Sequence, residues 1–204
     1  MEDKDLYDEI NSIKKIMERS TKFISLSGLS GILAGGYALI GAGIGYEIIY
    51  GNGILRGGYS IDIQLFSIAL IVLLLSITTG IALTARKAHR KGQTVWNQSS
   101  RALLKNGLLP LLTGGAFILI LLLHADYHII APSCLIFYGL ALAAASQYTY
   151  GDVKWLGITE IILGLLAMLL PGYGLLFWAL GFGVMHILYG SIMYFKYDRE
   201  NNAD

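Results

Sequence analysis

The chain has 204 residues, of which 55% are hydrophobic and only 14% are charged, against about 25% charged residues in ordinary globular proteins. From Asn106 to Phe195 the only formal charges are Asp126, Asp152, Lys154 and Glu160, too few for a water-facing surface, so we expect an all-α polytopic membrane protein. The net charge of +1 excludes the basic surface of a nucleic-acid-binding protein, and the single cysteine, Cys134, excludes a secreted domain built on internal disulfides.

Residues 1–22 predict an amphipathic helix on the cytoplasmic side. Leu6, Ile10, Ile13 and Met17 fall within a narrow stripe at 100° per residue. The segment lacks the apolar core and small-residue cleavage site of a signal peptide. Two roles stay open for it: a helix lying on the membrane or the bundle, or a docking helix for a cytoplasmic protein partner.

The apolar segments predict a bundle of six transmembrane helices, because about 20 residues are needed to cross a bilayer. They form a membrane domain over 23–198, which a cytoplasmic tail, 199–204, follows. Its spans lie at about 23–49, 61–85, 107–125, 128–148, 154–171 and 173–195, with a basic cytoplasmic loop at 86–105. The fifth and sixth spans form a tight hairpin, since Pro-Gly-Tyr-Gly at 171–174 is a chain-reversal signal.

The basic residues predict that both termini lie inside the cell. With six spans, fourteen of the fifteen Lys and Arg residues fall on the side of the N-terminus, and only Arg56 falls on the other. Cytoplasmic loops carry such an excess of Lys and Arg. The basic loop 86–105, in which we expect a helix around Thr94 to Leu104, either sets this orientation or also binds anionic lipid headgroups.

Glycine is abundant, with 25 residues, and most of them lie within the predicted spans. In the first span Ser27, Gly31 and Gly35 follow small-xxx-small spacing, as do Gly41 and Gly45. Small residues let helix backbones approach closely in a membrane. We interpret these stripes as packing surfaces, within the bundle or in a homo-oligomer, and keep open a substrate path lined by backbone.

The last two spans each carry one ionisable residue at the same predicted depth. Glu160 lies 11 residues before Pro171, and His186 lies 12 residues after Gly174. Glu160 shares its helix face with Gly157, Gly164 and Ala167, and His186 shares its face with Ala179, Gly183 and Gly190, so the two small-residue stripes allow these helices to approach closely. Ionisable groups inside a membrane are costly and face a partner or a wet cavity. We therefore predict a Glu160–His186 pair, which either couples proton movement, since His titrates near neutrality, or fixes the hairpin by a hydrogen bond.

A weaker candidate site lies at the predicted outer boundary. Its members are residues of the types that bind divalent metal ions: Glu47, Asp62, His124, Asp126 and His128. The spacing is not diagnostic, because the two histidines lie on either side of a turn. Ordinary solvated loop residues are the main interpretation, and we expect neither a bound metal nor a cofactor.

Sequence motifs of known enzymes are absent, so we expect no enzymatic activity. The segments PGYGLLFWALGFGVMHILYGSIMYFKY and MERSTKFISLSGLSGILAGG resemble a group of small bacterial multi-span membrane proteins with no established activity. The resemblance covers the ends of the chain better than its middle. It implies a location in the bacterial cytoplasmic membrane.

Three hypotheses about function follow. The first is a small-solute or ion transporter or channel subunit with Glu160 and His186 as its polar centre. The second is a non-enzymatic membrane sensor or scaffold that engages a partner through residues 1–22 and the loop 86–105. The third, a membrane enzyme, is favoured only if the outer carboxylates and histidines bind a metal. The lipid bilayer is the partner common to all three.

Overall fold

The computed structural model describes residues 23, 26–51, 60–90, 92 and 94–199. The predicted amphipathic helix of residues 1–22 and residues 200–204 of the predicted tail lie outside this part. Within it every regular element is a helix, and no strand occurs. The all-α prediction is therefore confirmed for the described residues.

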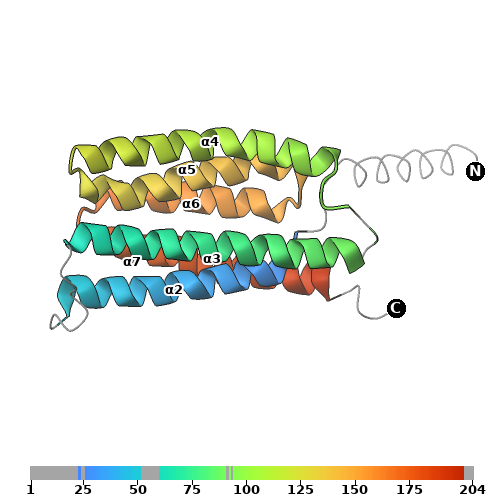
Figure 1. Cartoon of the computed structure of the whole chain (residues 1–204), viewed down its shortest axis with the longest axis horizontal. Helices are drawn as coiled ribbons and strands as arrows, with labels where there is room; N and C mark the ends of the chain where they lie inside the picture. Colours follow the sequence, from blue (N-terminus) through green and yellow to red (C-terminus); the bar gives the residue numbers. More distant parts are fainter. Residues whose placement is uncertain (1–22, 24–25, 52–59, 91, 93, 200–204) are drawn as a thin grey trace, which may run out of the picture.

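Six helical rods run through the described residues (Figure 1). Four are single α-helices: α2 (Gly28–Tyr50), α3 (Ile61–Arg90), α4 (Gln98–Leu123) and α6 (Asp152–Leu169). The rod between α4 and α6 joins η1 (Tyr127–Ile129), α5 (Ile130–Ala145) and η2 (Ser146–Tyr148). The last rod consists of four consecutive segments: α7 (Gly174–Trp178), the π-helical η3 (Ala179–Met185), α8 (His186–Met193) and the π-helical η4 (Tyr194–Asp198). We call this rod the last helix.

Five of these rods are long and apolar enough to cross a membrane: Gly28–Tyr50, Ile61–Arg90, Gln98–Leu123, Tyr127–Tyr148 and Gly174–Asp198. The sixth, α6, has 18 residues and carries three charged side chains, Asp152, Lys154 and Glu160. It runs alongside the other rods (Figure 1). The chain is thus a helical protein built to be embedded in a membrane.

The helices differ from the predicted spans mainly at the basic loop. We expected a loop over 86–105 with a helix around Thr94 to Leu104. Instead α3 continues to Arg90, and the expected loop helix forms the start of α4, which begins at Gln98. Lys and Arg are good helix formers, so basic residues extend both helices beyond their apolar parts. Asn97 then caps α4, since its side chain accepts from Ser100 N–H while the Ser100 hydroxyl accepts from Asn97 N–H, as in a capping box.

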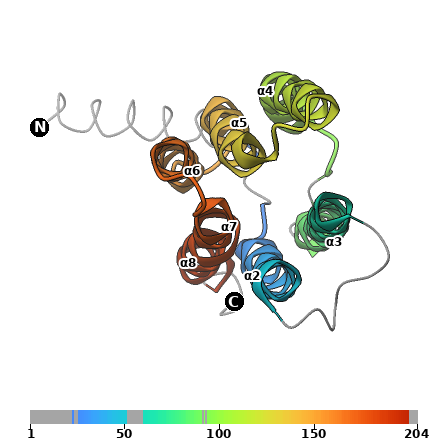
Figure 2. The same ribbon diagram turned by 90° about the vertical axis from the view of Figure 1, so that its left-hand side faces the viewer.

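The rods pack as two triplets, which the end-on view separates (Figure 2). The first triplet consists of α2, α3 and the last helix, and the second consists of α4, α5 and α6. Contacts between the triplets are fewer and lie where α5 and α6 meet the last helix. We call this contact the seam.

Glycines bring helix backbones together within the first triplet. A Cβ on Gly35 would lie 2.6 Å from Gly183 O, and one on Gly190 would lie 2.6 Å from Ile32 N. Neither position can carry a side chain without moving a backbone. Gly31 and Gly35 of the predicted stripe therefore pack against the last helix of the same chain.

The second triplet uses the same device between α5 and α6. A Cβ on Gly139 would lie 2.5 Å from Gly157 O, and one on Gly157 would lie 2.7 Å from Gly139 O. Such close approach is how apolar helices associate where lipid offers no hydrophobic driving force. It also fixes the face of α6 that carries Glu160, one turn beyond Gly157.

Charge is distributed unevenly along the bundle. Within the described part of the chain, every Lys and Arg lies at the end that holds the start of α2 and the end of the last helix (Figure 1). We call this the basic end. At the opposite end, Glu47 lies in the last turn of α2, Asp62 in the first turn of α3, and Asp126 just before η1.

Candidate functional site

Glu160 is the most deeply buried charged residue that the structure describes, with 0% of its surface exposed. It lies at the middle of α6, eight residues after Asp152 and nine before Leu169. Among the described residues, neither of its carboxylate oxygens has a hydrogen-bond partner. Buried polar groups in native proteins are nearly always hydrogen-bonded, so an unpaired buried carboxylate calls for an explanation.

His186 is the neighbour that the carboxylate faces. Its Nδ1 lies 3.4 Å from Glu160 Oε1 and 3.0 Å from Gly181 O, and its Nε2 lies 2.8 Å from Tyr138 Oη. A backbone carbonyl can only accept, so Nδ1 carries a hydrogen and donates it to Gly181 O. In the neutral ring Nε2 then accepts from the Tyr138 hydroxyl. The structure thus brings Glu160 and His186 together across the seam.

Gly181 makes room for the carboxylate. A Cβ at this position would overlap Glu160 Oε2 and would lie 2.5 Å from Leu135 Cδ2. Gly181 belongs to η3, whose wider π-helical turn ends just before His186. Short π-helical insertions occur frequently at functional sites. The missing side chain and the irregular turn together allow the last helix to approach α6 at this point.

The small residues that flank the pair do not pack as we predicted. We expected Gly157 and Gly164 on α6 to face Gly183 and Gly190 on the last helix. Gly157 and Gly164 instead pack on α5, whereas Gly183 and Gly190 pack on α2. Each glycine stripe packs on another helix of its own triplet. The Glu160–His186 pair therefore connects two separately packed triplets.

Tyr138 is a member of the site that the sequence analysis missed. It lies near the middle of α5, and its ring packs against His186 and Phe182, with centroid distances of 5.4 and 5.2 Å. A buried tyrosine hydroxyl normally finds a hydrogen-bond partner. A tyrosine this far from either end of an apolar span was therefore a usable signal, because boundary tyrosines are the common kind.

The arrangement can hold one proton. With that proton on either Glu160 or His186 the pair carries no net charge, and without it the buried carboxylate stands alone beside a neutral ring. An uncompensated buried ion costs several kcal/mol. The Tyr138 hydroxyl can donate to Nε2 of the neutral ring or accept from the imidazolium, so it bonds to His186 in both states.

No protein-family model, curated protein or solved structure matches this chain. The geometry of the described residues therefore carries the functional argument.

The candidate outer ion site is not assembled. Among the described residues, which include all five of its members, no group of three or more His, Cys, Asp or Glu side chains could hold a metal ion. His124 caps the end of α4, and its Nδ1 lies 2.9 Å from Ile120 O of the same helix. His128 lies in η1 beyond the turn. The turn thus separates the two histidines, and the solvated interpretation fits their exposure.

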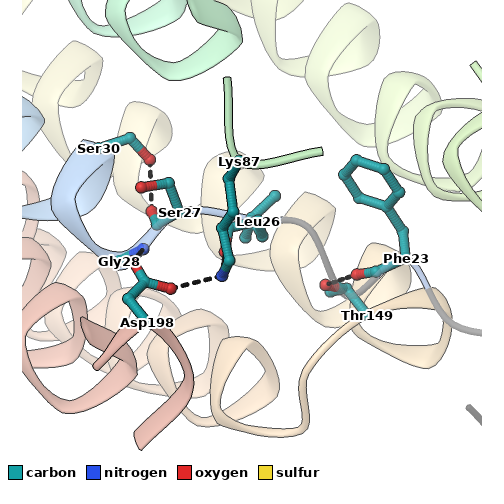
Figure 3. Close-up of polar contacts among 8 residues, drawn as sticks. All are labelled: Phe23, Leu26, Ser27, Gly28, Ser30, Lys87, Thr149 and Asp198. Atoms are coloured by element: carbon teal, nitrogen blue, oxygen red, sulfur yellow. Dashed lines mark hydrogen bonds and ion pairs between the residues drawn. The ribbon is translucent and has the colours of Figure 1, made fainter. Parts of the chain in front are cut away.

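A second polar cluster closes the basic end (Figure 3). Asp198, the last residue of η4, accepts from Gly28 N–H at 3.0 Å and forms an ion pair with Lys87 of α3. Lys87 Nζ also donates to Leu26 O at 2.7 Å. The Lys87 and Asp198 side chains are only 13% and 12% exposed. We call these four residues the clasp.

The clasp region also connects the first triplet to the second. Lys87 Nζ lies 5.5 Å from the ring centroid of Tyr150, which precedes α6. Phe23 N–H donates to Tyr148 O at 2.7 Å. The Thr149 hydroxyl donates to Phe23 O at 2.9 Å (Figure 3). Phe23 and Thr149 are both buried. Phe23 and Lys87 of α3 therefore each contact the second triplet at the basic end.

A more exposed ion pair lies nearby. Asp152 accepts from the Tyr197 hydroxyl at 2.7 Å and pairs with Lys196 at 3.1 Å. Partial burial raises the pKa of Asp152, but the hydrogen bonds from Tyr197 and Lys196 outweigh it and hold the pKa below its ordinary value. Because the Lys196 side chain is 55% exposed, this pair contributes little stability and offers a control for the clasp.

Proposed function

We propose that this chain is a proton-linked transporter or channel subunit for a small solute or ion. Glu160 and His186 form its polar centre, and the seam between the two triplets is the path that opens to it. In this proposal all six rods cross the membrane. The basic end faces the cytoplasm of a bacterial cell, as the excess of Lys and Arg favours.

One observation supports this proposal above the others. Neither carboxylate oxygen of Glu160, at the middle of its helix, has a hydrogen bond from the described residues, and Oε1 faces a histidine from the other triplet at 3.4 Å. Intramembrane carboxylates and histidines are rare and mark ion pathways and proton relays. A purely structural pair would gain more from full hydrogen bonding, which this carboxylate lacks.

The proposal is tested by proton movement in proteoliposomes. The protein is reconstituted around the pH-sensitive dye pyranine, and an imposed pH step is allowed to relax in the presence of valinomycin and K⁺. We expect wild-type vesicles to equilibrate faster than vesicles containing Glu160→Gln. Vesicles containing Glu47→Gln, which alters an acid at the end opposite the basic end, should equilibrate as fast as wild-type vesicles. Equal rates for wild type and Glu160→Gln would contradict proton-linked transport.

The alternative is a membrane sensor or scaffold, and the complete burial of Glu160 favours it. A sealed pair can fix the fold without contacting a solute. In that case the exposed basic end would contact a cytoplasmic partner. Equal proton rates together with an intact fold would support this alternative.

A further inference from the structure

The start of α6 and the end of the last helix meet at the basic end of the seam. Lys196 of η4 pairs with Asp152, the first residue of α6, at 3.1 Å, and the Tyr197 hydroxyl donates to the same carboxylate at 2.7 Å. Because α6 belongs to the second triplet and the last helix to the first, these bonds cross the seam. The two helices lie side by side in the end-on view (Figure 2).

Exposed basic and aromatic side chains flank this ion pair. Trp155 follows Asp152 by three residues and so shares its helix face, and it is 62% exposed. Phe195 is 59% exposed, and the Arg199 guanidinium lies over its ring, 5.9 Å from the centroid. Aromatic side chains at the ends of membrane helices lie at the level of lipid headgroups. We call Trp155, Phe195, Lys196 and Arg199 the interfacial patch.

The interfacial patch has an excess of positive charge. It contains Lys196 and Arg199, and the exposed Lys154 lies beside it at the start of α6. Asp152 neutralises one of these three cations. The carboxylate of Asp198, next to Arg199, pairs with a lysine inside the clasp. Among the described residues two positive charges thus remain for an anion, and Lys and Arg are the side chains that bind phosphate groups.

Exposed apolar side chains continue from the interfacial patch toward the middle of both helices. On α6, Ile162 follows Trp155 by seven residues and lies on the same face. On the last helix, Leu188 and Ile192 precede Phe195 on one face. A positive surface that continues into an apolar one matches a phospholipid, in which a phosphate and acyl chains are joined. A soluble acidic peptide would leave the two apolar stripes uncovered.

We propose that the interfacial patch binds the headgroup of an anionic phospholipid, which holds α6 and the last helix together at the basic end of the seam. Lys196 and Arg199 donate to the lipid phosphate, and the acyl chains lie along the exposed apolar stripes of the two helices. One lipid thus contacts a helix of each triplet. The site is separate from Glu160 and His186, and its occupation does not depend on proton movement.

The test is native mass spectrometry of the purified protein in a neutral detergent with added lipid. Phosphatidylglycerol is compared with phosphatidylcholine of the same acyl chains, so that the two lipids differ only in the headgroup. One double variant, Lys196→Met with Arg199→Met, removes the two cations of the interfacial patch. The matched control, Arg101→Met with Lys105→Met, removes two exposed cations from α4, which α5 separates from α6 (Figure 2).

We expect the wild-type protein to bind phosphatidylglycerol roughly tenfold more tightly than phosphatidylcholine. Each basic residue near an anionic surface contributes about fivefold in affinity, so the patch double variant should bind phosphatidylglycerol about 25-fold more weakly. The α4 double variant should bind it as tightly as wild type. If the patch double variant fails to fold, Arg199→Met alone should weaken binding about fivefold.

Three results would overturn the proposal. The first is equal binding of the two lipids by the wild-type protein. The second is an equal loss of phosphatidylglycerol in the two double variants, which would show attraction to the whole basic end instead of a site. The third is displacement of the lipid by millimolar inorganic phosphate, which would assign the patch to a free anion. None of these measurements involves Glu160, so their outcome is independent of the proton-movement assay.

Discussion

Removing His186 should destabilise the protein far more than its single ion pair suggests. His186→Leu leaves Glu160 fully buried without the histidine that it faces, and it takes the partner from the Tyr138 hydroxyl. Breaking a buried pair costs about 3–5 kcal/mol, and an orphaned buried hydroxyl costs about 1–3 kcal/mol more. We therefore expect a loss of roughly 4–8 kcal/mol in the free energy of unfolding.

Glu160→Gln changes less, because it removes the buried charge at nearly constant volume. The amide still needs partners, so we expect a loss of about 1–3 kcal/mol. In the double variant, Glu160→Gln with His186→Leu, the leucine no longer faces a charge. The double variant should therefore lose less free energy of unfolding than His186→Leu alone. Interaction energies between residues in contact reach about 0.5–3 kcal/mol in such cycles.

The assay is unfolding of the purified protein by sodium dodecyl sulfate in mixed micelles, followed by far-ultraviolet circular dichroism. Lys196→Met serves as the matched control, since an exposed pair contributes at most about 1 kcal/mol. Strictly additive losses in the double variant would refute the pairing of Glu160 with His186. So would a His186→Leu protein as stable as the Lys196→Met control.

The remaining predictions concern packing and topology. Gly31→Leu should weaken the first triplet, because even a Cβ at this position would lie 3.1 Å from Gly190 Cα. Gly36→Leu on the same helix is the control, because a Cβ there would have open space around it. Equal thermal stability of the two variants in detergent would show that the Gly31 face is not a packing surface. A cysteine replacing Ala125 should be labelled from outside in intact cells, whereas a cysteine replacing Val95 should be labelled only after permeabilisation. The reverse pattern would refute the orientation.

Much of the architecture follows from sequence because the bilayer restricts the outcome. Apolar segments near 20 residues long must be helical in a membrane, where backbone groups can only bond to one another. The distribution of Lys and Arg likewise indicates which ends of the rods lie together. Helix boundaries were predicted less well, since Lys and Arg extend a helix as readily as Leu does. Arg90 therefore lies in a helix that we expected to end at residue 85, and the expected loop helix is continuous with α4.

The Glu160–His186 pair could be predicted from the shared depth of the two residues and the small residues beside each, although the packing around the pair could not. Small-residue stripes show where a helix can be approached closely, but they do not name the approaching helix. From the sequence, Gly157 could have faced either the last helix or α5. The structure shows that it packs against Gly139 of α5. The assignment of helices to triplets is a long-range property that one sequence does not encode locally.

The clasp was missed for a different reason. Leu26 and Lys87 are 61 positions apart in the sequence, and Lys87 and Asp198 are 111 positions apart. In the sequence Lys87 is one of many basic residues near helix ends, and Asp198 is one acid near the C-terminus. Nothing local distinguishes a lysine that orients a loop from one that pairs with a buried carboxylate.

The central claim is that Glu160 binds and releases a proton inside the bundle. The most direct measurement is infrared difference spectroscopy of the purified protein in lipid between about pH 6 and about pH 8.5. The account predicts a pH-dependent carboxyl or carboxylate band that is present in wild type, retained in Glu47→Gln and absent in Glu160→Gln. A spectrum whose pH-dependent bands are the same in wild type and Glu160→Gln would contradict it.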